Sequence, residues 1–296
     1  MTRKGSEVRI LSFPPSLDLH HAEWFMVEIT DRIKERFLFT KKEGRAAFVS
    51  YVCAGDPDQE TSLLICQQLV QSGVDILELG MPFSDPLADG KTNQLAAERA
   101  LFAGAKQEKV FNLVRQIRQF SNLPIVLYTY YNLVFSMGLE TFAQTAKEAG
   151  VDGVLILDLP LEEANDWLLA SRGQSLSTIF IIAPTTQPQR IQKIVTHASG
   201  FIYYVSREGV TGEQKNMASG IAESVQLIKQ FTDLPVVVGF GVSSEKHVRL
   251  IAESADGVVV GSTLVKCIEE NVEQKSKIPE VLRAKLASLR KGLYIK

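Results

Sequence analysis

Three carboxylic acids that lie close together in the sequence are the residues best suited to chemistry in this chain. Glu78 interrupts an otherwise apolar run that includes Ile76, and Asp85 and Asp89 follow in the next loop. A carboxyl group inside an apolar strand loses solvation, which raises its pKa and suits it to proton transfer near neutral pH. The pattern therefore predicts an acid/base catalyst at Glu78.

Each of these acids also has a structural interpretation. Glu78 could belong to a buried ion pair, but we favour acid/base catalysis over that interpretation. Asp85 and Asp89 could be ordinary turn formers or caps of the following helix, since aspartate serves both purposes readily. For the two aspartates, the sequence pattern alone leaves both interpretations open.

The elements that must position these acids recur along the chain. Short apolar runs begin in the middle forties, and each is followed by a stretch with helical periodicity, as in residues 60–72, 108–120, 139–149, 187–197, 221–231 and 244–252. The predicted strands are 47–54, 75–79, 124–129, 153–157, 178–182, 201–205, 235–239 and 257–260. Eight βα units favour an α/β fold, a closed (β/α)8 or TIM barrel in a single domain; an open doubly wound sheet is the alternative.

The N-terminal residues differ in pattern from the rest. Met26, Ile29, Ile33 and Phe37 follow the spacing of an amphipathic helix, and this helix is expected to cover one end of the barrel. We therefore assign residues 26–296 to the barrel domain and residues 1–25 to a flexible N-terminal extension. The extension lacks the sustained apolar segment of a secretory signal.

Composition argues against several classes of protein. In the 296 residues, 45% are hydrophobic and the net charge is -2, so no basic surface for nucleic acid is expected. No apolar run approaches the roughly 18 residues of a transmembrane helix, and we predict no membrane association. The 3 cysteines are widely spaced, which favours a reducing, cytoplasmic location. The histidines show no metal-ligand spacing, so we expect no metal.

In a barrel, the loops that follow the strands form the catalytic end. Gly239, Gly241, Gly261 and Ser262 end the last two predicted strands, and small residues there allow backbone N–H groups to approach an anion. We predict a phosphate site at this place, with tight turns as the alternative interpretation. Residues 206–216, with Thr211 near their centre, have the length and composition of a mobile lid.

With these residues in view, the chain resembles the alpha subunit of tryptophan synthase over residues 29–286. The motifs that carry the resemblance are AGDP (54–57), LELGMPFSDPLADG (77–90), YYNLVF (130–135), SREGVTG (206–212) and GFGVS (239–243), in the order of the family. Five motifs in order make coincidence implausible.

The resemblance implies a retro-aldol cleavage of indole-3-glycerol phosphate to indole and glyceraldehyde 3-phosphate. It also implies a pyridoxal-phosphate beta subunit as partner in an αββα heterotetramer, and no cofactor in this chain. By the same resemblance, Glu78 would be the acid/base and Asp89 would accept the indole N–H. The loop 80–90 and the segment with Tyr131 and Asn132 would face the beta subunit; solvent-exposed turns are the alternative.

The family motifs imply further roles by position. Thr211, Asp85 and Asp158 would support the lid and the active site. Phosphate would be bound by Gly212, Gly241, Gly261 and Ser262. The indole pocket would be lined by Tyr51, Tyr128, Tyr130, Leu155, Leu157, Ile181, Tyr203 and Phe240.

Some positions depart from the family pattern. Lys91 stands where proline is usual, and Tyr51, Tyr128 and Leu157 stand where the family more often has Phe, Leu and a small residue. Two rival functions stay open: a regulatory barrel that only activates a beta subunit, and another phosphate-binding barrel enzyme such as an isomerase. A Schiff-base aldolase is disfavoured because no predicted strand ends in lysine.

Overall fold

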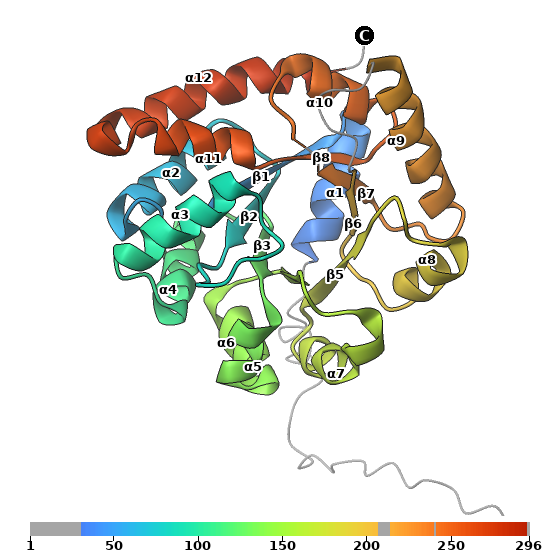
Figure 1. Cartoon of the computed structure of the whole chain (residues 1–296), viewed down its shortest axis with the longest axis horizontal. Helices are drawn as coiled ribbons and strands as arrows, with labels where there is room; N and C mark the ends of the chain where they lie inside the picture. Colours follow the sequence, from blue (N-terminus) through green and yellow to red (C-terminus); the bar gives the residue numbers. More distant parts are fainter. Residues whose placement is uncertain (1–30, 207–213, 240, 295–296) are drawn as a thin grey trace, which may run out of the picture. The chain divides into compact units, whose positions relative to one another are not determined.

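The computed structural model describes residues 31–206, 214–239 and 241–294, and in it eight parallel strands form a closed barrel (Figure 1). The strands are β1 (Ala47–Cys53), β2 (Ile76–Gly80), β3 (Ile125–Thr129), β4 (Gly153–Ile156), β5 (Ser177–Ile182), β6 (Ile202–Val205), β7 (Val236–Gly239) and β8 (Gly257–Val260). Pairing between β8 and β1 closes the sheet, which excludes the open sheet. Each strand begins and ends within one residue of its predicted range.

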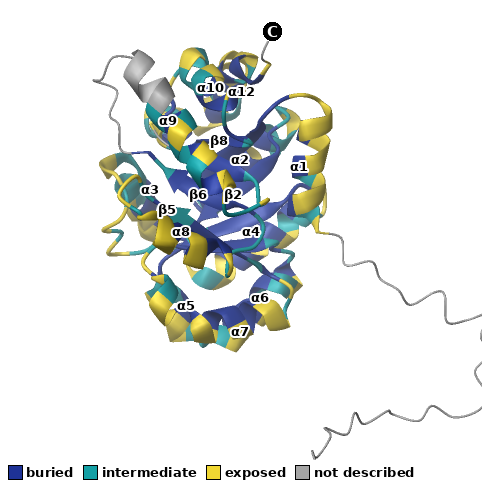
Figure 2. Cartoon of the chain, turned by 90° about the vertical axis from the view of Figure 1, so that its right-hand side faces the viewer, coloured by how far each residue is buried: buried dark blue, intermediate teal, exposed yellow. Residues whose placement is uncertain are grey.

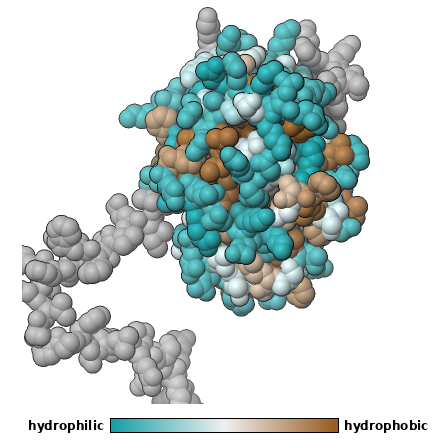
Figure 3. Space-filling view, turned by 90° about the vertical axis from the view of Figure 1, so that its left-hand side faces the viewer, coloured by the Kyte–Doolittle hydropathy of each residue, from teal (hydrophilic) through white to brown (hydrophobic). Residues whose placement is uncertain are grey.

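Helices surround the barrel and cover its outer surface. They are α1 (Arg32–Lys42), α2 (Gln59–Gln71), α3 (Lys91–Phe102), α4 (Gln107–Arg118), α5 (Tyr131–Met137), α6 (Leu139–Ala149), α7 (Asn165–Gly173), α8 (Pro188–Val195), α9 (Gln214–Lys229), α10 (Glu245–Ala252), α11 (Ser262–Glu269) and α12 (Ile278–Arg290). Most strand residues are buried, whereas the helices expose one face (Figure 2). On the side that carries α2, α3 and α4, small groups of apolar side chains lie among hydrophilic ones (Figure 3).

Helix α1 closes the end of the barrel at which the strands begin. Ile33 lies next to Gly153, the first residue of β4, and Phe37 packs on Phe201 just before β6, with ring centroids 5.8 Å apart. The described helix begins at Arg32, where the Asp31 side chain accepts a hydrogen bond from the Lys34 N–H as an N-cap. The predicted start near Met26 lies outside the described residues. The expected extension, residues 1–25, lies outside the described residues and stays a prediction.

Alternation along the strands separates two apolar cores. On β2, Leu77 and Leu79 pack outward against the helices, whereas Ile76 belongs to the core inside the barrel. Glu78 shares the inward face with Ile76, because side chains two residues apart point to the same side of a strand. This alternation carries the one charged residue of β2 into the barrel.

Buried ion pairs join the elements near the start of the strands. The Arg45 guanidinium donates to both carboxylate oxygens of Asp75, at 2.6 and 3.0 Å, and Asp75 also accepts from the Phe48 N–H. The partly buried Asp152 carboxylate accepts from Arg32 at Oδ1 and from Arg118 at Oδ2. These pairs lie away from the loops that follow the strands, so we assign them to the fold rather than to chemistry.

Candidate active site

Glu78 lies fully buried on the inner wall of the barrel, with 0% of the residue exposed. In the strand register it pairs with Tyr51 of β1 and Val126 of β3. Among the described residues, neither of its carboxylate oxygens has a hydrogen-bond partner and it forms no salt bridge. The alternative of a buried ion pair therefore finds no partner in the described part of the chain.

The surroundings of Glu78 favour its protonated form. Burial, and to a smaller extent the charge of Asp89, raise the pKa of Glu78 from 4.5 to about 8. Unpartnered buried carboxyl groups are uncommon in folded proteins and call for an explanation. A group with this pKa can give a proton to a substrate and take one back near neutral pH.

Asp89 lies in the loop between β2 and α3, and two tyrosine hydroxyls hold its carboxylate. The Tyr128 hydroxyl donates to Oδ1 at 2.8 Å, and the Tyr130 hydroxyl donates to Oδ2 at 2.7 Å. The N-cap of α3 is Gly90, and the Asp89 side chain accepts from no backbone N–H of the helix. Of the two interpretations of Asp89, the geometry favours a functional carboxylate over a helix cap.

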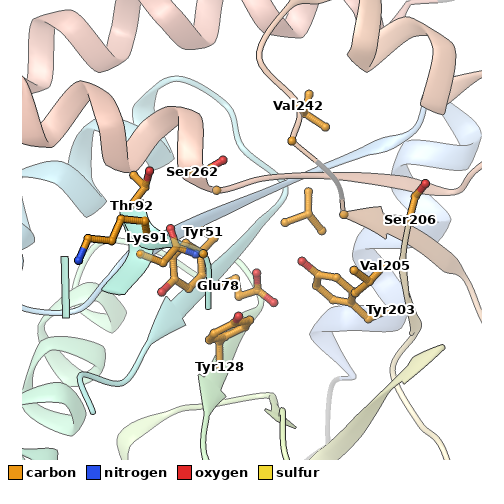
Figure 4. A pocket seen from close by; sticks show the side chains of 16 residues that line it. Tyr51, Glu78, Lys91, Thr92, Tyr128, Tyr203, Val205, Ser206, Val242 and Ser262 are labelled. Atoms are coloured by element: carbon orange, nitrogen blue, oxygen red, sulfur yellow. The ribbon is translucent and has the colours of Figure 1, made fainter. Parts of the chain in front are cut away.

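Glu78 faces a cavity of about 470 Å³ at the end of the barrel where the strands finish. Asp89 does not itself line this cavity, but it is hydrogen-bonded to Tyr128, which does. The side chains of Glu78, Tyr51, Tyr128 and Tyr203 converge on it (Figure 4). The three aromatic rings give the cavity flat apolar walls, which suit a planar ring. Lys91 lines its mouth, but the side chain is exposed and points away from Glu78 (Figure 4).

Two glycines make room for two of these tyrosines. A Cβ atom at Gly239 would lie 2.7 Å from Cε1 of Tyr203, and one at Gly80 would lie 2.8 Å from Cε2 of Tyr51. Both distances are shorter than real Cβ contacts. The rings can occupy these places only because the neighbouring strand residues have no side chain.

Small residues form another part of the cavity lining. Gly239, Gly241, Gly261 and Ser262 line it, and α11 begins at Ser262. The first N–H groups of a helix lack intrahelical partners, and the helix dipole adds a favourable field for an anion. Gly241 has a φ of +38°, in the region that favours glycine, so this turn also has a conformational reason for its residue.

The remaining predicted residues lie at the edge of the site or outside the described part. Tyr130, Leu155, Leu157 and Ile181 do not line the cavity; Tyr130 lies behind Asp89, and the three aliphatic residues belong to the interior core. Thr211, Gly212 and Phe240 lie outside the described residues.

The two supporting aspartates are exposed. Asp85 accepts a hydrogen bond from the Ser84 hydroxyl, and Asp158 accepts one from the Tyr131 N–H at 2.6 Å. Asp158 thereby links the loop after β4 to the first turn of α5. Neither carboxylate lines the cavity.

Some cavity residues were not predicted from the sequence. Asn93, in the first turn of α3, lines the cavity and lies 3.4 Å from Asp89 Oδ1 through its Nδ2. Val205, Val242 and Val259 also line it. Side chains two residues apart point to the same side of a strand, so Val259 of β8 could have been predicted from Gly261, which was already assigned to the site.

No group of three His, Cys, Asp or Glu side chains in the described residues could hold a metal ion. No helix in the described part is long and apolar enough to cross a membrane.

A parallel eight-stranded barrel with a protonatable glutamate and a second carboxylate at the catalytic end defines an acid/base barrel enzyme with a small-molecule site. Comparison with known proteins gives the family. The family model for "Tryptophan synthase alpha chain" matches residues 37–293.

Individual relatives agree with that family. The chain is 55% identical over 258 residues to the tryptophan synthase alpha chain of Opitutus terrae, which covers 87% of this chain and 96% of the relative. It is 45% identical over 262 residues to that of Geotalea uraniireducens, covering 88% and 97%. The crystal structure of the alpha subunit from Legionella pneumophila superposes with a TM-score of 0.82 at 36% identity, covering 89% of this chain and 98% of that one.

The chain belongs to the tryptophan synthase alpha chain family. It is therefore a carbon–carbon lyase of tryptophan biosynthesis, which cleaves indole-3-glycerol phosphate to indole and glyceraldehyde 3-phosphate. Membership also implies a beta-subunit partner. The family resemblance seen in the sequence motifs is confirmed.

Proposed function

We propose that Glu78 and Asp89 carry out the cleavage of indole-3-glycerol phosphate in this barrel. The observation that carries the proposal is the buried Glu78 carboxyl, unpartnered among the described residues, with a pKa of about 8. Protonated Glu78 gives its proton to the indole ring carbon that bears the glycerol phosphate chain. The resulting cation is stabilised by the negative charge of Asp89, which accepts the indole N–H.

The second half of the reaction returns the proton to Glu78. Its carboxylate takes the proton of the hydroxyl group on the carbon next to the ring, and the oxygen electrons form the aldehyde of glyceraldehyde 3-phosphate. The carbon–carbon bond breaks as these electrons move, and its electron pair neutralises the indole cation. Glu78 ends the cycle protonated, so no other acid or base is required.

The phosphate group would bind at the small-residue wall of the cavity. We assign it to the backbone N–H group of Gly241, after β7, and to those of Gly261 and Ser262, at the start of α11. Gly212 is proposed as a fourth contributor and Thr211 as the lid residue next to Asp89, both on the sequence motif alone.

Measurement of indole release by the purified chain tests these roles. Wild type should release indole, and Glu78→Gln and Asp89→Asn should each lower kcat by at least about 100-fold, the scale of a lost acid/base or charge-stabilising group. Glu148→Gln removes an exposed carboxyl group of α6 and is the control. No indole from the folded wild type, with or without a beta subunit, would favour the regulatory barrel.

For the partner we propose an αββα heterotetramer with a pyridoxal-phosphate beta subunit. Leu87 in the loop after β2 is 89% exposed and Phe135 of α5 is 65% exposed, so each could be buried by a partner at the two segments that the family resemblance assigns to the beta subunit. In size-exclusion chromatography with a beta subunit, Leu87→Ser and Phe135→Ser should weaken co-elution. Leu38→Ser alters an exposed leucine of α1 at the opposite end of the barrel and should not.

The cytoplasm is our proposed location for this complex. The three cysteines of the described residues are free, as expected in a reducing compartment. Cell fractionation with an antibody to the chain would test the location, and enrichment outside the cytoplasmic fraction would contradict it.

A further inference from the structure

The hydroxyl group of Tyr128 occupies a distinctive place between the cavity and Asp89. The Tyr128 side chain lines the same cavity as Glu78, and its hydroxyl donates to Asp89 Oδ1 at 2.8 Å. Its ring packs edge-on against Tyr51, with centroids 4.9 Å apart. The barrel therefore fixes the ring, and the hydroxyl hydrogen bond holds Asp89, a loop residue 39 positions earlier in the chain.

The loop that carries Asp89 is packed at its start, where the Phe83 ring lies 5.1 Å from that of Tyr130, but the residues next to Asp89 have little apolar packing. Leu87, Ala88 and Gly90 are exposed, and Asp89 is only half-buried. Hydrogen bonds take the place of packing: Tyr128 and Tyr130 donate to the carboxylate, and the Tyr130 hydroxyl accepts from the Ala88 N–H at 3.1 Å. Bonds from hydroxyl to carboxylate are stronger than neutral ones and are directional.

The two tyrosines differ in their position relative to the substrate site. Tyr128 lines the cavity, whereas Tyr130 does not and approaches the other carboxylate oxygen. A carboxylate offers about four acceptor positions, so it can take a third donor while both hydroxyls stay in place. Asp89 does not line the cavity, whereas Tyr128 and Gly90 do, so a ring N–H that reaches Asp89 from the cavity would approach it beside the Tyr128 hydroxyl.

We propose that Tyr128 is a positioning residue that holds the Asp89 carboxylate in the orientation that receives the substrate N–H. The proposal rests on the role of Asp89 given under Proposed function. The distance from the N–H to the ring carbon is fixed in an indole, so the orientation of Asp89 also sets where that carbon lies relative to Glu78. Misplacement of the reacting group by about 1 Å can reduce a rate by about 100-fold.

Tyr128 is suited to remain a donor across the working pH range. Burial, and then the charge of Asp89, raise the pKa of the Tyr128 hydroxyl well above 10. The tyrosine therefore keeps its proton at the alkaline pH at which Glu78 loses its own.

The test compares steady-state cleavage by wild type and Tyr128→Phe, which keeps the ring and its contact with Tyr51. We expect kcat to fall about tenfold while KM changes less than about threefold, because positioning acts mainly in the transition state. Tyr294→Phe is the matched control: it removes the hydroxyl of an exposed tyrosine near the C-terminus that does not line the cavity, and should leave kcat unchanged.

The same change in an Asp89→Asn background separates positioning from a merely structural effect. If Tyr128 acts through the Asp89 carboxylate, Tyr128→Phe should alter kcat by less than about twofold there, since the two effects are not additive. Equal losses in both backgrounds, or a Tyr128→Phe variant with the kcat of wild type, would overturn the proposal. Wild-type indole release in the same assay tests the proposed function separately.

Discussion

The negative charge of Asp89 and the burial of Glu78 both favour the protonated form of the Glu78 carboxyl group. Both raise the pKa of Glu78, burial more than charge, to about 8. The residue proposed to stabilise the cationic intermediate therefore also keeps the proton on the acid that generates it. This coupling determines how the enzyme should respond to pH.

Activity should decline in alkaline solution. Since the cycle begins with protonated Glu78, kcat/KM should be nearly constant below pH 8 and fall about tenfold per pH unit above it. Initial rates of indole release from about pH 7 to about pH 10 would give the pH at which the rate is half-maximal. The substrate phosphate does not titrate in this range, because the second pKa of a phosphate monoester is about 6. A rate that rises through pH 8 would mean that Glu78 starts as a base.

Asp89→Asn should move this midpoint to lower pH. Removing the negative charge takes away the part of the Glu78 pKa shift that Asp89 causes, while the larger part due to burial remains. The pH profile of the residual activity of the variant would show the shift. An unchanged midpoint would indicate that the two carboxylates do not interact in solution.

Glu78→Gln should stabilise the barrel increasingly as pH rises. The folded pKa of Glu78 is raised above its ordinary value of 4.5. The unfolded chain loses this proton first, so the wild type loses stability as pH rises from about 4.5 to about 8. Between low pH and pH 7, the free energy of unfolding of the wild type should therefore fall by about 3 kcal/mol relative to that of Glu78→Gln, measured by urea unfolding of both proteins. A difference independent of pH would contradict the raised pKa.

Gly239→Ala should harm both stability and catalysis. The added methyl group would overlap the ring of Tyr203, and overpacking of this kind costs about 1–3 kcal/mol. Displacement of the ring into the cavity should also raise KM. Gly173→Ala is the control for thermal unfolding, because an added Cβ there meets nothing within 4 Å and alanine favours the helix.

Arg99→Met should destabilise the loop after β1. Arg99 donates two hydrogen bonds, at 2.8 and 2.9 Å, to Asp56, whose side chain is fully buried. Loss of one partner from a buried ion pair costs about 3–5 kcal/mol. Burial already raises the pKa of Asp56, so the loss should shrink in acid as the carboxyl group takes up a proton.

An exposed pair provides the comparison. Arg190 and Glu162 form a salt bridge at the surface, and Arg190→Met should change the urea midpoint little. Equal effects of Arg99→Met and Arg190→Met would mean that burial does not govern the strength of the Asp56 pair.

The sequence was sufficient to predict the strands but not every helix. Short apolar runs mark buried parallel strands well, because both faces are covered. Helix α7 was not singled out, and α9 begins at Gln214, seven residues before the predicted start at residue 221, because its first residues are mostly polar or small. Periodicity is informative only where apolar residues repeat.

Prediction of the site was limited in a different way. Glu78 could be recognised because a charge in an apolar strand is unusual, and it lies where the pattern placed it. The contact of Tyr128 with Asp89 could not be predicted, since it depends on how the loop after β2 folds back over β3. The residues next to Tyr128 or Asp89 in the sequence do not indicate that the two side chains form a hydrogen bond.

Burial of an unpartnered acid inside the barrel wall also has an evolutionary consequence. If Glu78→Gln ends turnover and strengthens the fold, selection for stability alone would remove the acid. Descendants released from the need to cleave substrate would thus be expected to lose Glu78 early, while a barrel that still binds a beta subunit could persist. Gene duplicates in this family that lack the acid should then unfold at a higher temperature than their active counterparts.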